Sequence, residues 1–165
     1  MALPKLGYPT YELELPSTGK TIKYRPFLVK EEKVLLLALD SKDEKQVINA
    51  VKDLIKNCVT TRIKVDTLPS FDLEYLFLKI RGASIGENII LTVTCLDDNE
   101  TQVEATINID EVEVFKPEGH DKKIMFDDKT GLVMKYPSMK EFVDREFLQK
   151  DMKTDEVYEF IADSI

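Results

Sequence analysis

Residues 91–109 read LTVTCLDDNETQVEATINI, a stretch in which apolar residues recur at every second position. Leu91 and Val93 alternate with threonines, and a second alternating run begins at Val103. Between the two runs, residues 97–100 are Asp-Asp-Asn-Glu, which includes types that favour turns. Two alternating runs joined by a turn predict a β-hairpin, so this part of the chain is β-structured.

Two further hairpins are predicted on either side of this one. Residues 11–24, YELELPSTGKTIKY, alternate apolar and polar side chains around a turn at Pro16–Gly19. Residues 124–126 and 132–136 form the third predicted pair, around the loop 127–131. Period-two patterning therefore occurs at the start of the chain and throughout its second half.

Helical periodicity dominates the residues between the first two hairpins. In the first helix, Leu35, Leu36 and Leu39 are expected to form one apolar stripe, and in the second Val47 and Cys58 begin and end an amphipathic face. The three predicted helices cover 29–39, the segment from a Ser41–Glu44 capping box to Cys58, and 71–81, with Ser70 as cap and Gly82 as stop signal.

The order of these elements predicts an α+β fold in two halves. Residues 1–82 hold the first hairpin and three amphipathic helices, and residues 83–165 form a β-rich half that ends in helices. Gly82–Gly86 is the expected hinge between them, although one compact domain is the alternative. A second capping box, Ser138–Glu141, opens one C-terminal helix. The other covers 155–165, and its pattern still runs at the last residue, so we expect the parent chain to continue.

Composition excludes several classes of protein. The 165 residues carry a net charge of −8, which opposes binding to nucleic acid or to an anionic membrane. The longest apolar run, residues 34–39, is too short to span a bilayer. Cys58 and Cys95 are expected to be free, buried thiols, and a single histidine, His120, disfavours most zinc enzymes.

The acidic loops offer one alternative function, a metal-dependent hydrolase. Asp97 and Asp98 in one loop and Asp127 and Asp128 in another supply the carboxylates that Ca²⁺ or Mg²⁺ prefers. Neither loop follows the spacing of a calcium-binding loop, and aspartates are common turn residues. The turn interpretation is therefore favoured, and we expect no catalytic residues, metal, cofactor or small-molecule ligand.

The start of the chain is basic and the remainder acidic. Residues 1–30 hold five Lys or Arg and two Glu, a charge of +3, so the remainder carries −11. Tyr24, Arg25 and Phe27 combine aromatic and guanidinium groups at the end of the first hairpin, and we predict that they bind a partner. In the alternative interpretation, Arg25 pairs with acidic groups of its own chain, and Phe27 fastens the hairpin to the first helix.

Three segments resemble the T-even-type phage baseplate hub assembly proteins. They are LPSTGK (15–20) with YRPFLVKEEK (24–33), LPSFDLEYLFL (68–78) with Arg81 and Ser84–Gly86, and GLVMKYP (131–137). The resemblance covers nearly the whole chain. It implies a non-enzymatic role in building the hub of a contractile tail, as assembly chaperone or hub component. The implied partners are other hub or tape-measure proteins, in the host cytoplasm during assembly or in the virion baseplate.

Overall fold

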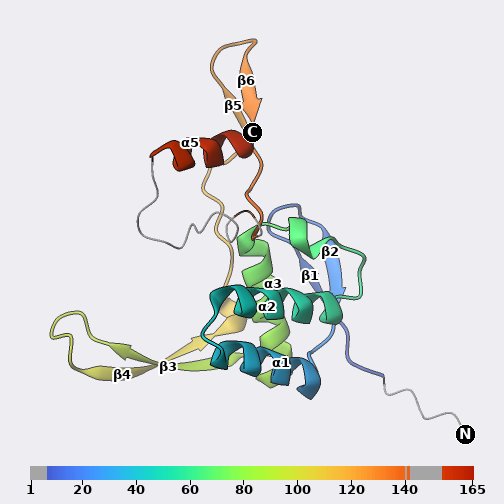
Figure 1. The fold of residues 1–165 in the computed structure, drawn as a ribbon, viewed down its shortest axis with the longest axis vertical. Coiled ribbons are helices and arrows are strands. Elements are labelled where there is room, and N and C mark those ends of the chain that lie inside the picture. The colour runs from blue at the N-terminus through green and yellow to red at the C-terminus, as the bar shows by residue number, and fades with distance from the viewer. Residues whose placement is uncertain (1–6, 140, 142–153) are drawn as a thin grey trace, which may run out of the picture.

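The computed structural model describes residues 7–139, 141 and 154–165, and it confirms the α+β class (Figure 1). The elements of the first half are β1 (Tyr11–Glu14), β2 (Thr21–Tyr24), α1 (Val29–Asp40), α2 (Glu44–Cys58), η1 (Val65–Thr67) and α3 (Ser70–Ile85). Those of the second half are β3 (Asn88–Thr94), β4 (Gln102–Asn108), η2 (Ile109–Glu111), β5 (Lys123–Met125), β6 (Gly131–Val133) and α5 (Thr154–Asp163).

All three predicted hairpins are confirmed, each as a separate two-stranded antiparallel sheet. Leu13 pairs with Ile22 in the first sheet and Leu91 with Ala105 in the second. The third pairs β5 with β6 and is shorter than its sequence pattern suggests. In Figure 1 the β3–β4 and β5–β6 hairpins project from the body in different directions.

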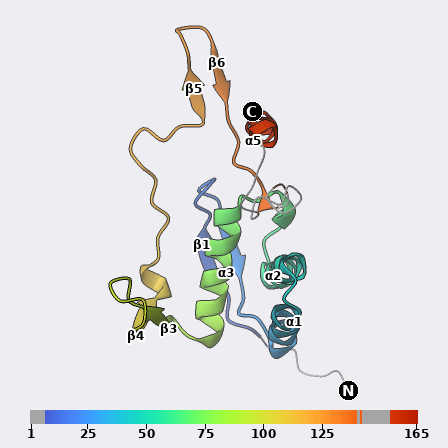
Figure 2. The same ribbon diagram turned by 60° about the vertical axis from the view of Figure 1, so that its left-hand side comes forward.

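The core lies where β1–β2, α2 and α3 meet (Figure 2). The predicted apolar faces of α2 and α3 both contribute to it. Tyr24 at the end of β2 forms a bridge with Val59, immediately after α2, which ties the hairpin to that helix. The buried members of the core are Leu15, Ile22, Tyr24, Leu54, Ile55, Cys58, Val65, Leu73, Leu76 and Ile80.

The predicted leucine stripe of α1 is wrong. Glu31 and Ala38 are buried, and Leu35 is half-buried, so the inward face follows positions 31, 35 and 38. Leu36 and Leu39 are 58% and 52% exposed. The sequence misleads here because leucines lie on several sides of the helix, while the buried apolar position is the small Ala38.

Helix boundaries in α2 and α3 also differ from the predictions. Helix α3 begins at Ser70, with Pro69 and not Ser70 as its N-cap. Asp43, and not Ser41, caps α2: its side chain accepts hydrogen bonds from the backbone N–H groups of Lys45 and Gln46. Helix α3 continues through Gly82 to Ile85, and its C-cap is Gly86, whose φ of +128° lies in the region that favours glycine. The expected hinge at residues 82–85 is therefore helical, while the division into two halves stays a prediction.

The C-terminal capping box is confirmed, because the Ser138 N–H donates to Glu141 and the Glu141 N–H donates to the Ser138 hydroxyl. The helix that it opens lies outside the described residues. The last helix, α5, ends at Asp163 instead of running to Ile165, and Ser164 bonds back to it through the carbonyl of Phe160.

Candidate functional site

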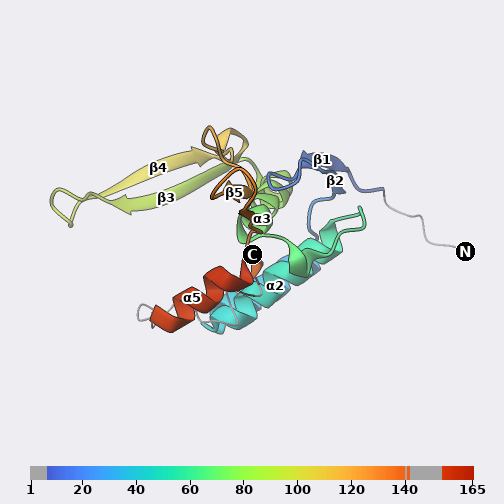
Figure 3. The ribbon, with the colours of Figure 1, turned by 90° about the horizontal axis from the view of Figure 1, so that it is seen from above.

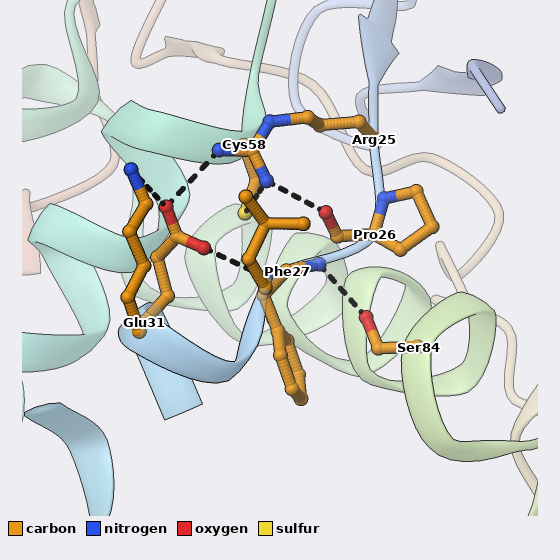
Figure 4. Close-up of polar contacts among 8 residues, drawn as sticks. Arg25, Pro26, Phe27, Glu31, Cys58 and Ser84 are labelled. Atoms are coloured by element: carbon orange, nitrogen blue, oxygen red, sulfur yellow. Dashed lines mark hydrogen bonds and ion pairs between the residues drawn. The ribbon is translucent and has the colours of Figure 1, made fainter. Parts of the chain in front are cut away.

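The predicted partner-binding residues lie at the junction of β2 and α1, and Figure 4 shows two of them, Arg25 and Phe27. Tyr24 is 6% exposed and stacks on Tyr11, with ring centroids 5.6 Å apart. Phe27 is half-buried against the core, and its backbone N–H donates to the Ser84 hydroxyl on α3 at 3.0 Å. Both aromatic residues therefore contribute to the packing of the hairpin against the helices.

Arg25 lies between these two residues and makes an internal ion pair. Its Nη2 is 3.1 Å from Oε1 of Glu31, and the two side chains are 15% and 4% exposed. Its Nη1 donates to the carbonyl of Pro26 at 2.7 Å, and the guanidinium lies 5.7 Å from the centre of the Tyr8 ring. This guanidinium is thus engaged within the chain.

The carboxylate of Glu31 connects the hairpin to the beginning of α1. Burial raises its pKa, but the Leu28 N–H and the charges of Arg25 and Lys30 outweigh burial and hold the pKa below its usual value. Oε2 accepts the Leu28 N–H at 2.7 Å, and the Lys30 ammonium lies 3.5 Å from Oε1. Sequence reasoning missed Glu31, although its place three residues after the cap Leu28 is the signal of a capping carboxylate.

These contacts agree with the alternative interpretation, in which Arg25 pairs with acidic groups of its own chain. The structure brings Tyr24, Arg25 and Phe27 together, but it directs their polar and aromatic groups toward neighbours in the same chain. Their role in binding a partner stays a prediction.

The acidic loops are the tips of two different hairpins. Asp98 accepts the N–H groups of Glu100 and Thr101, each at 3.0 Å, and the Thr101 hydroxyl. The Thr101 hydroxyl and these N–H groups lower the pKa of Asp98 to about 2. Asp127 likewise accepts the N–H groups of Lys129 and Thr130. Both aspartates thus stabilise turns, and no cluster of three or more metal-ligating side chains forms within the described residues.

The β3–β4 hairpin carries an exposed apolar surface, whereas sequence reasoning identified only its alternating pattern. Cross-strand partners share a face, so three pairs form one apolar face: Ile89 with Ile107, Leu91 with Ala105, and Val93 with Val103. We call these six residues the β3–β4 face. Leu91, Val93, Val103 and Ile107 are 43–49% exposed. An isolated two-stranded sheet is marginally stable in water, so burial of this apolar face would stabilise the hairpin.

Comparison with known protein families identifies the family of this chain. Residues 8–165 match the family described as T4 bacteriophage base plate protein. The chain belongs to this family. No curated protein and no solved structure matches this baseplate protein. None of its described helices is long and apolar enough to cross a bilayer.

A second apolar surface of the baseplate protein lies on α1. Val29, Leu36 and Leu37 are 79%, 58% and 62% exposed, and they lie opposite the buried Glu31 and Ala38 on the helix. Sequence reasoning found the leucines but not their exposure, because a helix that is apolar on several sides does not reveal which side faces the body.

The two thiols of the baseplate protein have different surroundings. Cys58 is fully buried, and burial raises its pKa to about 11. Cys95 is half-exposed at the end of the uncovered β3–β4 hairpin, so the expectation that it is buried is wrong. The alternation that placed Cys95 on an apolar face was correct, but in this chain nothing within the described residues fully covers that position.

Proposed function

We propose that this baseplate protein is a non-enzymatic protein-binding factor in assembly of the baseplate hub, acting as a hub component or as an assembly chaperone. Its proposed partners are other hub or tape-measure proteins, which it meets in the host cytoplasm before the tail is complete. The observation that carries the proposal is the uncovered β3–β4 face, supported by the exposed apolar residues of α1.

The exposed area of the chain supports docking on a partner. The chain exposes 12440 Å², whereas a compact monomer of 19.0 kDa exposes about 8,400 Å². The residues outside the described ranges contribute at most about 3,200 Å², the value for a fully extended chain of their length. The described part therefore exposes at least about 9,200 Å², whereas a compact protein of its own mass, about 16.8 kDa, exposes about 7,650 Å². The excess is at least about 1,600 Å². That excess equals the contribution of one partner to about two standard interfaces.

A phage lacking this gene, complemented with variants, tests the proposal. Val93→Thr combined with Val103→Thr keeps β-branched side chains of similar shape but makes the β3–β4 face polar. Ile90→Thr, on the opposite face and 67% exposed, is the matched control. We expect the double variant to fold but to yield few complete baseplates, and the control to assemble normally. Normal baseplates from the folded double variant would overturn the proposal.

Mass spectrometry separates the two proposed roles. A hub component is present both in assembly intermediates and in purified virions, whereas a chaperone is present in intermediates alone. Absence from both would contradict a role in assembly altogether.

A further inference from the structure

The charge of the β3–β4 hairpin singles it out from the rest of the chain. Residues 82–115 contain eight Asp or Glu and no Lys or Arg, a charge of −8. This equals the net charge of the whole protein, so the remaining residues hold equal numbers of acidic and basic side chains. We call residues 87–113, which hold all eight acids, the acidic arm. All of its charges lie in or beside the hairpin that carries the β3–β4 face.

Most of the acidic side chains lie beyond the two ends of the apolar face. Asp97, Asp98 and Glu100 lie at the tip of the arm, and Glu87 and Asp110 lie at its base, next to the ends of β3 and β4. The other three acids are Glu104, on the polar face of β4, and Glu111 and Glu113, which follow the base. Figure 3 shows the arm extending away from the helices, with its tip at the far end.

Little within the chain compensates this charge. Among the described residues, the one ion pair to an acid of the arm joins Lys79 to Asp110 at 4.0 Å, at the base. Towards the tip, Leu96 is 92% exposed beside the acidic turn. The arm thus presents apolar side chains between two groups of negative charge, at its tip and its base, which together form an acidic rim. Its two outer strand edges are unpaired in the described chain.

We propose that the acidic arm binds a different protein, on an apolar surface that is bordered by lysine and arginine side chains. This proposal rests on the proposed function and specifies the chemistry of the partner. The β3–β4 face supplies the area that is removed from water, while the acidic rim selects a basic partner and speeds the encounter.

The same charges argue against a second copy of this chain as the occupant. If two arms packed face to face with parallel directions, the acidic tips would meet. If they packed in opposite directions, the tip of one would meet Glu87 and Asp110 of the other. Like charges at close range disfavour both arrangements.

Binding of a defined peptide to the purified full-length chain tests the proposal. The probe is a fluorescent peptide of alternating leucine and lysine, as long as β3, measured by anisotropy at about 50 mM and about 200 mM salt. The comparison peptides are an alternating leucine–glutamate peptide and a leucine–lysine peptide of the same composition in scrambled order. We expect the alternating leucine–lysine peptide to bind most tightly, with an affinity that falls as salt rises.

Three variants connect this binding to the arm. Val93→Thr with Val103→Thr removes the apolar contacts, and Asp97→Asn with Glu100→Gln removes charges at the tip without touching the turn aspartate Asp98. We expect each pair of substitutions to weaken binding at least about tenfold, the effect of losing hot-spot contacts. The control Ile90→Thr should leave binding unchanged. Melting curves establish that every variant is folded.

The possible outcomes are decisive. The proposal would be overturned if the leucine–glutamate peptide bound as tightly as the alternating leucine–lysine peptide. It would also be overturned if neither double variant bound the leucine–lysine peptide more weakly than the wild type does. If the chain sediments as a dimer, and Val93→Thr with Val103→Thr dissociates that dimer, the occupant of the face is a second copy and the proposal is overturned. Such a failure is distinct from failure of the proposed function, since baseplate assembly in the complementation experiment is measured independently of partner charge.

Discussion

Replacing Arg25 with Ala removes one member of an ion pair whose other member, Glu31, is 4% exposed. The substitution leaves the Glu31 carboxylate with the Leu28 N–H and the exposed Lys30 ammonium at 3.5 Å. Breaking a fully buried pair costs about 3–5 kcal/mol. Since Arg25 is 15% exposed and Lys30 remains, we expect Arg25→Ala to lower the free energy of unfolding by about 2–3 kcal/mol.

Urea denaturation measures this loss, and the same hairpin provides a control. Lys23 lies 3.0 Å from Glu12, but both side chains are about 60% exposed. Lys23→Ala should therefore change the free energy of unfolding by less than about 1 kcal/mol. In a double-mutant cycle, Arg25→Ala and Glu31→Gln should show a coupling of at least about 1 kcal/mol.

The dependence on pH gives a second measure of this pair. The folded-state pKa of Glu31 lies below the ordinary value of 4.5, so its ionised form stabilises the fold. This contribution is complete above the ordinary value and is lost as the pH falls through the folded value. When the pH is lowered from about 7 to about 3, the free energy of unfolding should therefore fall less in Glu31→Gln than in the wild type.

An unchanged free energy of unfolding in Arg25→Ala would refute this reasoning. If that folded variant also failed to bind hub proteins, the predicted partner role of Tyr24, Arg25 and Phe27 would gain support. If the variant is destabilised and binds normally under conditions where it is folded, the ion pair serves the fold alone.

Three other predictions concern local structure. A thiol reagent should label Cys95 without denaturant and Cys58 only after unfolding; rapid labelling of both would contradict the described burial. Trypsin should cleave after Lys116, in the irregular segment that follows η2, before it cleaves within α3, and early cuts in that helix would contradict the fold. Gly86→Ala should cost about 1 kcal/mol or more because of its positive φ, whereas Gly82→Ala, inside α3, should be neutral or stabilising by calorimetry. Equal effects at the two glycines would be inconsistent with the observed end of α3.

The elements that the sequence predicted best are those whose pattern has a single interpretation. The amphipathic face of α2 has one apolar side, and the structure packs its residues from Val51 to Cys58 into the core or against it. The three hairpins follow from strict alternation and turn residues. In both cases the local pattern and the tertiary contacts favour the same conformation.

The errors arose where tertiary contacts decide between locally similar choices. Leucines on several sides of α1 did not reveal that Ala38 lies on its buried side. Gly82 is tolerated within a helix, so the stop falls at Gly86, where the backbone requires a positive φ. Alternation in β3 and β4 identified an apolar face but not what covers it.

The candidate site was predictable in composition but not in its contacts. Tyr24, Arg25 and Phe27 do lie together, as neighbours in sequence must. The ion pair between Arg25 and Glu31 depends on how the hairpin enters α1, which no residue pattern specifies.

The central claim, that the β3–β4 face docks on another baseplate protein, is tested most directly by photocrosslinking in assembling baseplates. In one variant of this chain, a photoreactive phenylalanine analogue replaces Val93 on the β3–β4 face. In a second variant it replaces Ile90 on the opposite side of the hairpin. The account predicts that the Val93 position crosslinks to a basic segment of a different baseplate protein, and that the Ile90 position does so far less. Equal crosslinking from both positions, or crosslinks from Val93 only to a second copy of this chain, would contradict it.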